Sequence, residues 1–438
     1  MEQKYIVAVE IGSSKVKGAV GTVDNNGTMT VRAIEEEPLI DCVRYGCIQN
    51  VEEVSNRVTR IIRKIENRVS PRKVRGIYVA LGGRSLCSSA REIERQYSDE
   101  VEITERIVSQ LKNEALATGF SDRDVVEVIP REFTVDNMSM SNPIGTFGQQ
   151  ISATLNLLSC KPQIKRNLNR VLNERLQFKV NGYIVRPVAV ADLVLSDDEK
   201  RLGCMLVDFG AETTTVSIYK NGSLQYLVTV PLGSRNITRD ITSLNFLEER
   251  AEEIKKAVGN ANASESGKRK PSADGIDTSE INGYVQARAG EIVANIMEQV
   301  NYAGLKAADL PGGIVVVGGG AKLKGFNALL ETQSKLKVRS GAPSNMIPIA
   351  DGRIQPNDSV DVIAILMAAS RMNPVECMEM SVPITGGDDE PDDIYESDDT
   401  DDDPGQKVPK GPGLLERIKR RIEGLISEDD EEFDDDER

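Results

Sequence analysis

Two stretches of this chain share one pattern: YIVAVEIGSSKVKGAVG (residues 5–21) and CMLVDFGAETTTVSIYKNG (residues 204–222). In each, an apolar strand ends in an acidic residue, a glycine and small or hydroxylated residues follow, and a second alternating strand comes next. The turn between the strands exposes backbone N–H groups and hydroxyls that can surround a polyphosphate. The repeated pattern predicts two similar half-domains that close on one nucleotide.

The first turn offers Gly12, Ser13 and Ser14 for close contacts to phosphates, and Lys17 on the outgoing strand offers a positive charge. A single turn of this kind is also typical of an ordinary β-hairpin. The phosphate-binding interpretation therefore depends on the second occurrence.

The second turn offers Gly210, Thr213 and Thr214 in equivalent places, after the acidic residue Asp208. A carboxylate at this point suits the orientation of a hydrated Mg²⁺ ion beside the β- and γ-phosphates. Asp208 is therefore the candidate catalytic residue, on the side of the site that holds the phosphates and Mg²⁺. ATP with Mg²⁺ is the expected cofactor.

A third element reads VVVGGGAKLKGF (residues 315–326), in which a buried strand enters Gly318, Gly319 and Gly320 before a helix begins. A backbone free of side chains lets a nucleoside lie against it, and a helix N-terminus favours phosphate. A tight strand–helix turn that binds nothing is the alternative. Two phosphate turns, a helix with Glu and Lys and a triple glycine, in this order, resemble the superfamily of actin, the sugar kinases and the heat-shock chaperone ATPases.

Composition narrows the possible functions. A chain of 438 residues is long enough for two or more domains. It contains no histidine, which excludes a Ser-His-Asp triad, a histidine general base and a histidine-ligated metal. The six cysteines have no C-x-x-C spacing and are interpreted as reduced thiols. No apolar run approaches the roughly 20 residues of a membrane span, and we expect no secretory signal.

The net charge of −15 is concentrated near the C-terminus. Residues 381–438 contain 22 acidic and 7 basic residues, whereas residues 1–380 contain 47 of each sign. Because the main body has no net charge and no basic stripe, we expect no nucleic-acid partner.

The most specific stretch lies between the two phosphate turns. It reads VIPREFTVDN (residues 128–137), then NPIG (residues 142–145), then ISATLNLLSC (residues 151–160). These motifs closely resemble those of a small subdomain in the FtsA family, the bacterial actin-like proteins that anchor the tubulin-like FtsZ ring to the membrane. The resemblance covers roughly residues 4–375 and a C-terminal helix.

The resemblance implies an actin/ribonuclease H-like α/β fold, with two lobes around a nucleotide cleft, an inserted small α/β subdomain and a C-terminal amphipathic helix. The expected boundaries are 1–82 and 162–202 for the first lobe, to which 359–372 returns; 83–161 for the insert; 203–235 and 310–358 for the base of the second lobe; 236–309 for its partner-binding subdomain; 381–412 for a disordered acidic linker; 413–427 for the membrane-targeting helix; and 428–438 for an acidic tail.

Family roles extend to residues near the phosphate turns. Glu10 stands where the family has an acid at the end of the first phosphate strand. The stretch AEEIKKAVG (residues 251–259) resembles a family helix, which implies that Glu252 and Lys255 reach the ribose or adenine.

A second helix gives candidates for partner binding. VQARAGEIV (residues 285–293) resembles a helix of the partner-binding subdomain, so Arg288 and Glu291 are expected to contact the C-terminal tail of FtsZ. An ordinary solvated helix face is the alternative.

Two features depart from the family pattern. Many relatives have Gly-Gly-Gly where this chain has Gly210, Ala211 and Glu212, and the Glu212 carboxylate is expected to add negative charge near the γ-phosphate. The segment 259–280 is rich in Ser, Gly, Asn and Lys, looks longer than usual and is expected to be a mobile loop.

The tail contains KVPKGPGLLERIKRRIEGLISED (residues 407–429), which predicts an interfacial amphipathic helix. Its apolar face and its basic residues are expected to bind an anionic membrane surface; they are Leu414, Leu415, Ile418, Ile422, Leu425 and Ile426, with Arg417, Lys419, Arg420 and Arg421. Docking on the protein's own body or on another subunit is the alternative.

The function implied by the resemblance is that of an ATP-binding cell-division protein at the cytoplasmic face of the inner membrane. It would anchor FtsZ filaments at the division site, form filaments with itself and help to recruit later division proteins, with at most slow ATP hydrolysis. The alternatives are a pilus-assembly actin homologue, a superfamily kinase and the rod-shape actin homologue.

Overall fold

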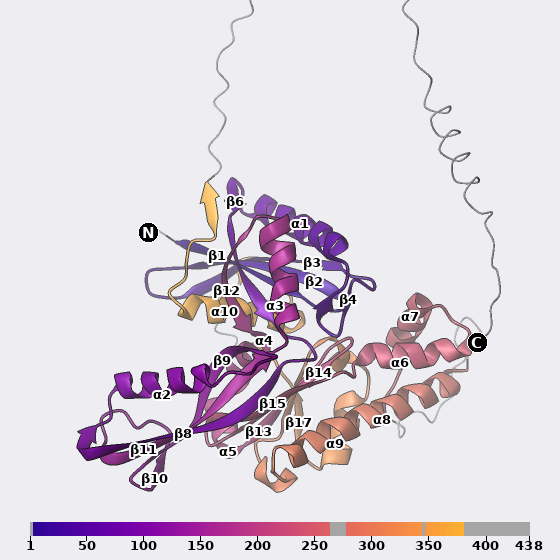
Figure 1. Ribbon diagram of the computed structural model, residues 1–438. Helices are drawn as coiled ribbons and strands as arrows, with labels where there is room; N and C mark the ends of the chain where they lie inside the picture. Colours follow the sequence, from indigo (N-terminus) through magenta and orange to yellow (C-terminus); the bar gives the residue numbers. More distant parts are fainter. Residues whose placement is uncertain (1–2, 263–276, 344–346, 381–438) are drawn as a thin grey trace, which may run out of the picture. The chain divides into compact units, whose positions relative to one another are not determined.

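The computed structural model describes residues 3–262, 277–343 and 347–380 (Figure 1). The expected linker, membrane helix and acidic tail lie outside the described residues, as does most of the loop predicted at 259–280. The described residues all fall within one unit of the chain, Met1–Val382. None of their helices combines the length and the apolar character needed to cross a membrane.

One sheet has five strands in the order β12-β7-β1-β2-β3. Its strands are β1 (Lys4–Ile11), β2 (Lys15–Val23), β3 (Met29–Pro38), β7 (Gly76–Leu81) and β12 (Lys179–Val185). The first three form an antiparallel meander, as the alternating sequence predicts, and β1, β7 and β12 run parallel. Both faces of β1 and β7 are buried, which explains why these strands are apolar almost throughout.

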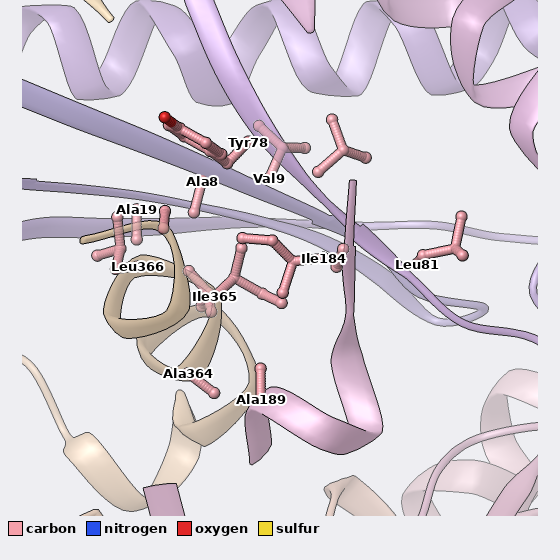
Figure 2. Packing of buried hydrophobic residues seen from close by; sticks show 14 of the residues in the cluster. Ala8, Val9, Ala19, Tyr78, Leu81, Ile184, Ala189, Ala364, Ile365 and Leu366 are labelled. Atoms are coloured by element: carbon pink, nitrogen blue, oxygen red, sulfur yellow. The ribbon is translucent and has the colours of Figure 1, made fainter. Parts of the chain in front are cut away.

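Helices cover this first sheet. On one face, α10 (Val360–Arg371) packs against the sheet and against α4 (Arg186–Val194), where Ile365 and Leu366 lie close to the strands (Figure 2). The amphipathic helix α1 (Val51–Arg68) packs against β2 and β3 through its apolar stripe. Of these helices, α4 carries Arg186 and α10 carries Asp361, and both residues line the site described below.

The second sheet has nine strands in the order β10-β9-β11-β8-β15-β14-β13-β16-β17. Its strands are β8 (Cys87–Glu102), β9 (Asp124–Val135), β10 (Met138–Met140), β11 (Phe147–Cys160), β13 (Cys204–Phe209), β14 (Thr214–Lys220), β15 (Ser223–Val230), β16 (Ile314–Val317) and β17 (Val338–Ser340). β13 and β16 are fully apolar apart from one residue, Asp208. The register of this parallel pair sets Asp208 opposite Val317, next to the triple glycine.

The structure also contains further α-helices and short strands. They are α2 (Glu105–Ala117), α3 (Pro162–Asn169), α5 (Asp197–Leu202), α6 (Ser234–Ile241), α7 (Glu248–Val258), α8 (Thr278–Tyr302), α9 (Phe326–Ser334), β4 (Val43–Arg44), β5 (Cys47–Ile48), β6 (Arg72–Val74) and β18 (Met378–Met380).

Residues 87–160 build their own apolar core from β8, β9, β11 and α2. The strands of this segment connect to the rest of the nine-stranded sheet where β8 pairs with β15, through a bridge between Cys87 and Val228 and a hydrogen bond of 2.8 Å from the Leu227 backbone N to Ser88 Oγ. The long strand β8 is absent from the sequence interpretation because its exposed alternation of charged residues gives no apolar signal.

The sequence predicts single helices over residues 236–258 and 162–176, and both are interrupted in the structure. The first is divided into α6 and α7, because Asn245 adopts a left-handed conformation with φ of 65° that ends the first part. The second continues beyond α3 as a π-helical turn, Arg170–Arg175.

Candidate functional site

A cavity of about 1020 Å³ lies where the carboxyl ends of strands from both sheets meet. Parallel α/β sheets commonly bind ligands at this edge. The walls include twelve residues singled out from the sequence: Glu10, Gly12, Ser13, Ser14, Lys17, Asp208, Gly210, Thr213, Glu252, Gly318, Gly319 and Gly320. The fold therefore brings the two phosphate turns and the triple glycine together around one space.

The triple glycine has two reasons to lack side chains. A Cβ on Gly318, whose φ is 93°, would lie 2.5 Å from the Phe209 carbonyl oxygen, and a Cβ on Gly320 would lie 2.7 Å from the Phe209 ring. That ring stacks on Phe326 with centroids 4.4 Å apart. A Cβ on Gly319 would meet nothing within 4 Å. Two glycines thus allow close packing, and the middle one leaves the cavity wall open.

Two ion pairs in the cavity wall join Arg186 to Glu10 and to Asp208. Arg186 begins α4, and its Nη1 lies 3.2 Å from Glu10 Oε1 while its Nη2 lies 2.7 Å from Asp208 Oδ2. Burial raises the pKa of Glu10 to about 7, and the guanidinium of Arg186 offsets part of that rise. Arg186 Nε has no hydrogen-bond partner among the described residues.

Lys17 lies in the cavity wall, with its charge already paired. Its Nζ donates to Asp361 Oδ1 at 2.8 Å and to the Asp358 carbonyl oxygen at 2.7 Å. Burial alone would lower the pKa of Lys17, but the Asp361 carboxylate outweighs it and the pKa is raised. Lys17 is therefore held as a cation by α10, in whose first turn Asp361 lies.

Glu212 is buried and fully partnered. Its carboxylate accepts a hydrogen bond of 2.6 Å from the Tyr45 backbone N and lies 3.2 Å from Arg235 Nη1 and 3.3 Å from Arg239 Nη2. The sequence predicted extra negative charge near a γ-phosphate at this position. The two arginines of α6 supply the compensating charge, which the sequence interpretation did not foresee.

Thr214 and Lys255 do not reach the cavity wall. Thr214 is buried and donates to the Leu232 carbonyl oxygen at 2.7 Å. Lys255 Nζ donates to Glu252 Oε2 at 2.6 Å and to Thr238 Oγ1 at 2.8 Å, and burial lowers the pKa of Lys255. The neighbouring Lys256 lines the cavity instead.

The predicted partner-binding pair lies on α8 but is engaged within the protein. Arg288 Nε lies 2.6 Å from Asp240 Oδ2, and Arg288 also pairs with Glu291. The first contact ties α8 to α6. Glu291 remains about half exposed.

The sequence interpretation missed Arg186, Asp361, Arg235 and Arg239 as residues of the site. Arg186 could have been recognised from the sequence, because it directly follows the strand that ends at Val185. Glu10 and Asp208 likewise lie near the ends of their strands. The partners of Glu212 had no such signal, because they depend on contacts between segments far apart in the sequence.

A family profile described as "Cell division protein FtsA" matches residues 205–359, and one described as "SHS2 domain inserted in FTSA" matches residues 83–159. Cell division protein FtsA of Porphyromonas gingivalis is 33% identical over an alignment of 334 residues that covers 74% of this chain and 69% of that protein. The protein of the same name from Escherichia coli is 28% identical over an alignment of 380 residues that covers 82% of this chain and 89% of that protein.

The structure is also similar to a chain of a PilM-PilN type IV pilus biogenesis complex, with a TM-score of 0.59 and 15% identity, over 83% of this chain and 98% of that chain. At this identity the likeness shows the fold alone. The actin-like fold with an inserted subdomain, expected from the sequence, is thereby confirmed. On the sequence matches, this chain belongs to the FtsA family of cell-division proteins.

Proposed function

We propose that this protein binds ATP in the cavity described above and anchors FtsZ filaments to the cytoplasmic face of the cell membrane at the division site. It forms filaments with itself and helps to recruit later division proteins. The observation that carries the nucleotide part is the convergence of both phosphate turns and the triple glycine on one cavity of about 1020 Å³ in an FtsA-family chain.

The lining residues fit a nucleoside triphosphate. In this proposal the backbone of Gly12 and Gly210, with the hydroxyls of Ser13, Ser14 and Thr213, binds the phosphates. The nucleoside lies against the open backbone of Gly319, and Glu252 and Lys256 bind the ribose or base.

The described side chains offer Mg²⁺ only part of a ligand set. No cluster of three metal-ligating side chains is found among residues 3–262, 277–343 and 347–380. Mg²⁺ would therefore be held mainly by phosphate oxygens and water beside Asp208, and it would supply charge neutralisation for the phosphates.

We propose that the segments delimited from the sequence have separate functions. Residues 83–161 form the inserted subdomain, and residues 236–309 form the subdomain that binds the FtsZ tail. Arg288 and Glu291 contribute to this surface in the proposal, and Arg288 would exchange its bond to Asp240 for one to an acidic peptide.

Membrane attachment is assigned to residues 413–427. Each basic residue near an anionic leaflet contributes about 1 kcal/mol, so that one helix binds weakly and reversibly. Filaments hold many such helices at one surface, and the resulting avidity increases membrane residence. Filament formation and membrane attachment thus support each other.

The nucleotide part is tested by calorimetric titration of ATP with Mg²⁺ into the full chain and into two variants, Asp208→Ala and Gly319→Val. The proposal requires binding to the parent and loss of binding to both variants. Gly319→Val is the sharper variant, because its side chain enters open space and leaves the packing of Phe209 intact. Unchanged affinity of a folded Gly319→Val protein would refute the assignment.

A further inference from the structure

Two adjacent residues, Tyr45 and Gly46, connect the two phosphate turns. The Tyr45 backbone N–H donates to Glu212 in the second turn at 2.6 Å, and the Gly46 backbone N–H donates to Ser13 Oγ in the first turn at 3.2 Å. Ser13, Gly46 and Glu212 all line the cavity. We call residues 45–46 the connector, because their two N–H groups contact both turns at once.

The backbone of the connector is held in one shape. Both of its residues have positive φ, 52° at Tyr45 and 77° at Gly46, in a region that non-glycine residues seldom adopt. The Tyr45 carbonyl oxygen accepts a hydrogen bond of 2.9 Å from the Arg84 backbone N. A Cβ on Gly46 would clash with the Cα of Gly83. The connector is therefore closely packed against residues 83–84, and its N–H groups point in fixed directions.

The Glu212 side chain that receives the connector is also fixed. It is only 1% exposed, and Arg235 and Arg239 approach Oε1 at 3.2 Å and 3.3 Å, which leaves Oε2 for the Tyr45 N–H. A glycine at position 212 would have no side chain to make this contact. The carboxylate therefore ties the second phosphate turn to the connector, and the connector ties it to the first.

This arrangement sets the spacing of groups that bind phosphate in the proposed function. Because Ser13 Oγ accepts a hydrogen bond from Gly46, its own proton is free to donate to a phosphate oxygen. Groups that are held in place before a ligand arrives bind it more tightly. Residue 212 is expected to lie near the γ-phosphate, so the phosphate that ADP lacks would be the one nearest the connector.

We propose that Glu212 is a positioning residue: it acts through Tyr45 and Gly46 to fix the spacing of the two phosphate turns, and it thereby gives the cavity a preference for ATP over ADP. The inference rests on the proposed function, since it concerns the same cavity.

The test measures the dissociation constants of ATP and of ADP, both with Mg²⁺, by calorimetry on the full chain and its variants. The parent should bind ATP at least about tenfold more tightly than ADP. In Glu212→Ala the connector loses its acceptor, so this preference should fall by about tenfold, the size of effect expected for one hydrogen bond. Glu212→Gln keeps an oxygen acceptor for the Tyr45 N–H and should retain the preference within about threefold.

A matched control is Glu199→Ala. Like Glu212, Glu199 accepts a hydrogen bond from a backbone N, that of Ser196 at 2.8 Å, and pairs with an arginine, Arg339 at 2.8 Å. Glu199 does not line the cavity. Its loss should therefore leave the ratio of the ADP constant to the ATP constant unchanged, whereas a general loosening of the fold would weaken both nucleotides alike.

A second variant covers the case in which Glu212→Ala does not fold. Glu212→Ala/Arg239→Met removes one charge of each sign, so that Arg239 is not left as an unpaired cation. Arg235 keeps its ion pairs with Asp41 at 3.7 Å and Glu248 at 3.4 Å. This double variant should show the same fall in the preference for ATP.

The outcomes separate this inference from the proposed function. A parent that binds ATP and ADP equally well overturns the inference and leaves nucleotide binding intact, and so does a folded Glu212→Ala protein with the parent's preference. A Glu212→Gln protein that loses as much preference as Glu212→Ala also overturns it, because that variant keeps the acceptor for the connector. A parent that binds neither nucleotide refutes the proposed function itself.

Discussion

The Glu212 carboxylate accepts a hydrogen bond of 2.6 Å from the backbone N of Tyr45, across 167 residues of sequence. Tyr45 lies between β4 and β5, whereas Glu212 lies in the second phosphate turn. Two arginines of α6, Arg235 and Arg239, pair with the same carboxylate. One buried acid therefore connects the hairpin, the turn and the helix around the cavity.

Glu212→Ala should lower the free energy of unfolding by about 3 kcal/mol, because it leaves the partly buried Arg235 and Arg239 without their carboxylate. Glu212→Gln should cost less, since it keeps an acceptor for the Tyr45 amide. Urea unfolding of the three proteins measures the difference.

The control for this experiment is Glu379→Ala, which breaks an exposed pair with Arg75 and should change stability by less than about 1 kcal/mol. Equal midpoints for the parent and Glu212→Ala would contradict the assigned role of Glu212.

Glu10 should give the protein a specific pH dependence. Burial raises its pKa from 4.5 to about 7, so the folded state holds this proton more tightly than the unfolded state. Its contribution to stability is therefore present below the unfolded pKa and is lost as the pH rises through the folded pKa. Relative to Glu10→Gln, the parent should lose roughly 3 kcal/mol between these values. Urea unfolding at a series of pH values measures the difference, and two parallel stability curves would rule the effect out.

Lys255 and Lys256 are adjacent, but substitution of the first should mainly lower stability and substitution of the second should mainly weaken ATP binding. Lys255→Met removes the buried ammonium that binds Glu252 and Thr238, and should destabilise the fold by about 2 kcal/mol. Lys256→Met should leave stability within about 0.5 kcal/mol but weaken ATP binding, because this exposed side chain lines the cavity. Thermal melting and ATP titration of both variants provide the comparison. Reversed effects would show that the lysines are wrongly assigned.

The triple glycine offers a second matched pair. Gly320→Ala should destabilise the protein by about 1–3 kcal/mol, since the new Cβ would lie 2.7 Å from the Phe209 ring. Gly319→Ala should leave the melting temperature nearly unchanged, because its Cβ would meet open space. Similar melting temperatures for both variants would show that the close packing at Gly320 does not limit stability.

The parts of the site that the sequence predicted are local. A phosphate turn is a short strand–turn–strand pattern, and the triple glycine is a strand–turn–helix pattern, so both can be recognised from a few consecutive residues. The missed parts depend on distant segments: Arg186 and Glu10 are 176 residues apart, and Glu212 and Tyr45 are 167 apart. A sequence pattern gives the residue types at such positions but not their partners.

The same distinction applies to the fold. The apolar strands β1, β13 and β16 were predicted because both of their faces are buried. β8 was missed because its side chains are mostly half-buried or exposed, and it is held mainly by its pairing with β11. Lys255 was expected to reach the ligand because residues 251–259 resemble a family helix, and a motif match does not show which of two adjacent lysines faces the cavity; Lys255 contacts Thr238, and Lys256 lines the cavity.

The central claim is that this protein links FtsZ to the membrane, and co-flotation with liposomes tests it most directly. Liposomes that contain anionic lipid are mixed with FtsZ, ATP and either the full chain or a variant that lacks residues 414–426. We predict that FtsZ floats with the liposomes only when the full chain is present. FtsZ that floats equally well with the truncated protein would contradict the account. So would FtsZ that fails to float with the full chain as well as with the truncated protein.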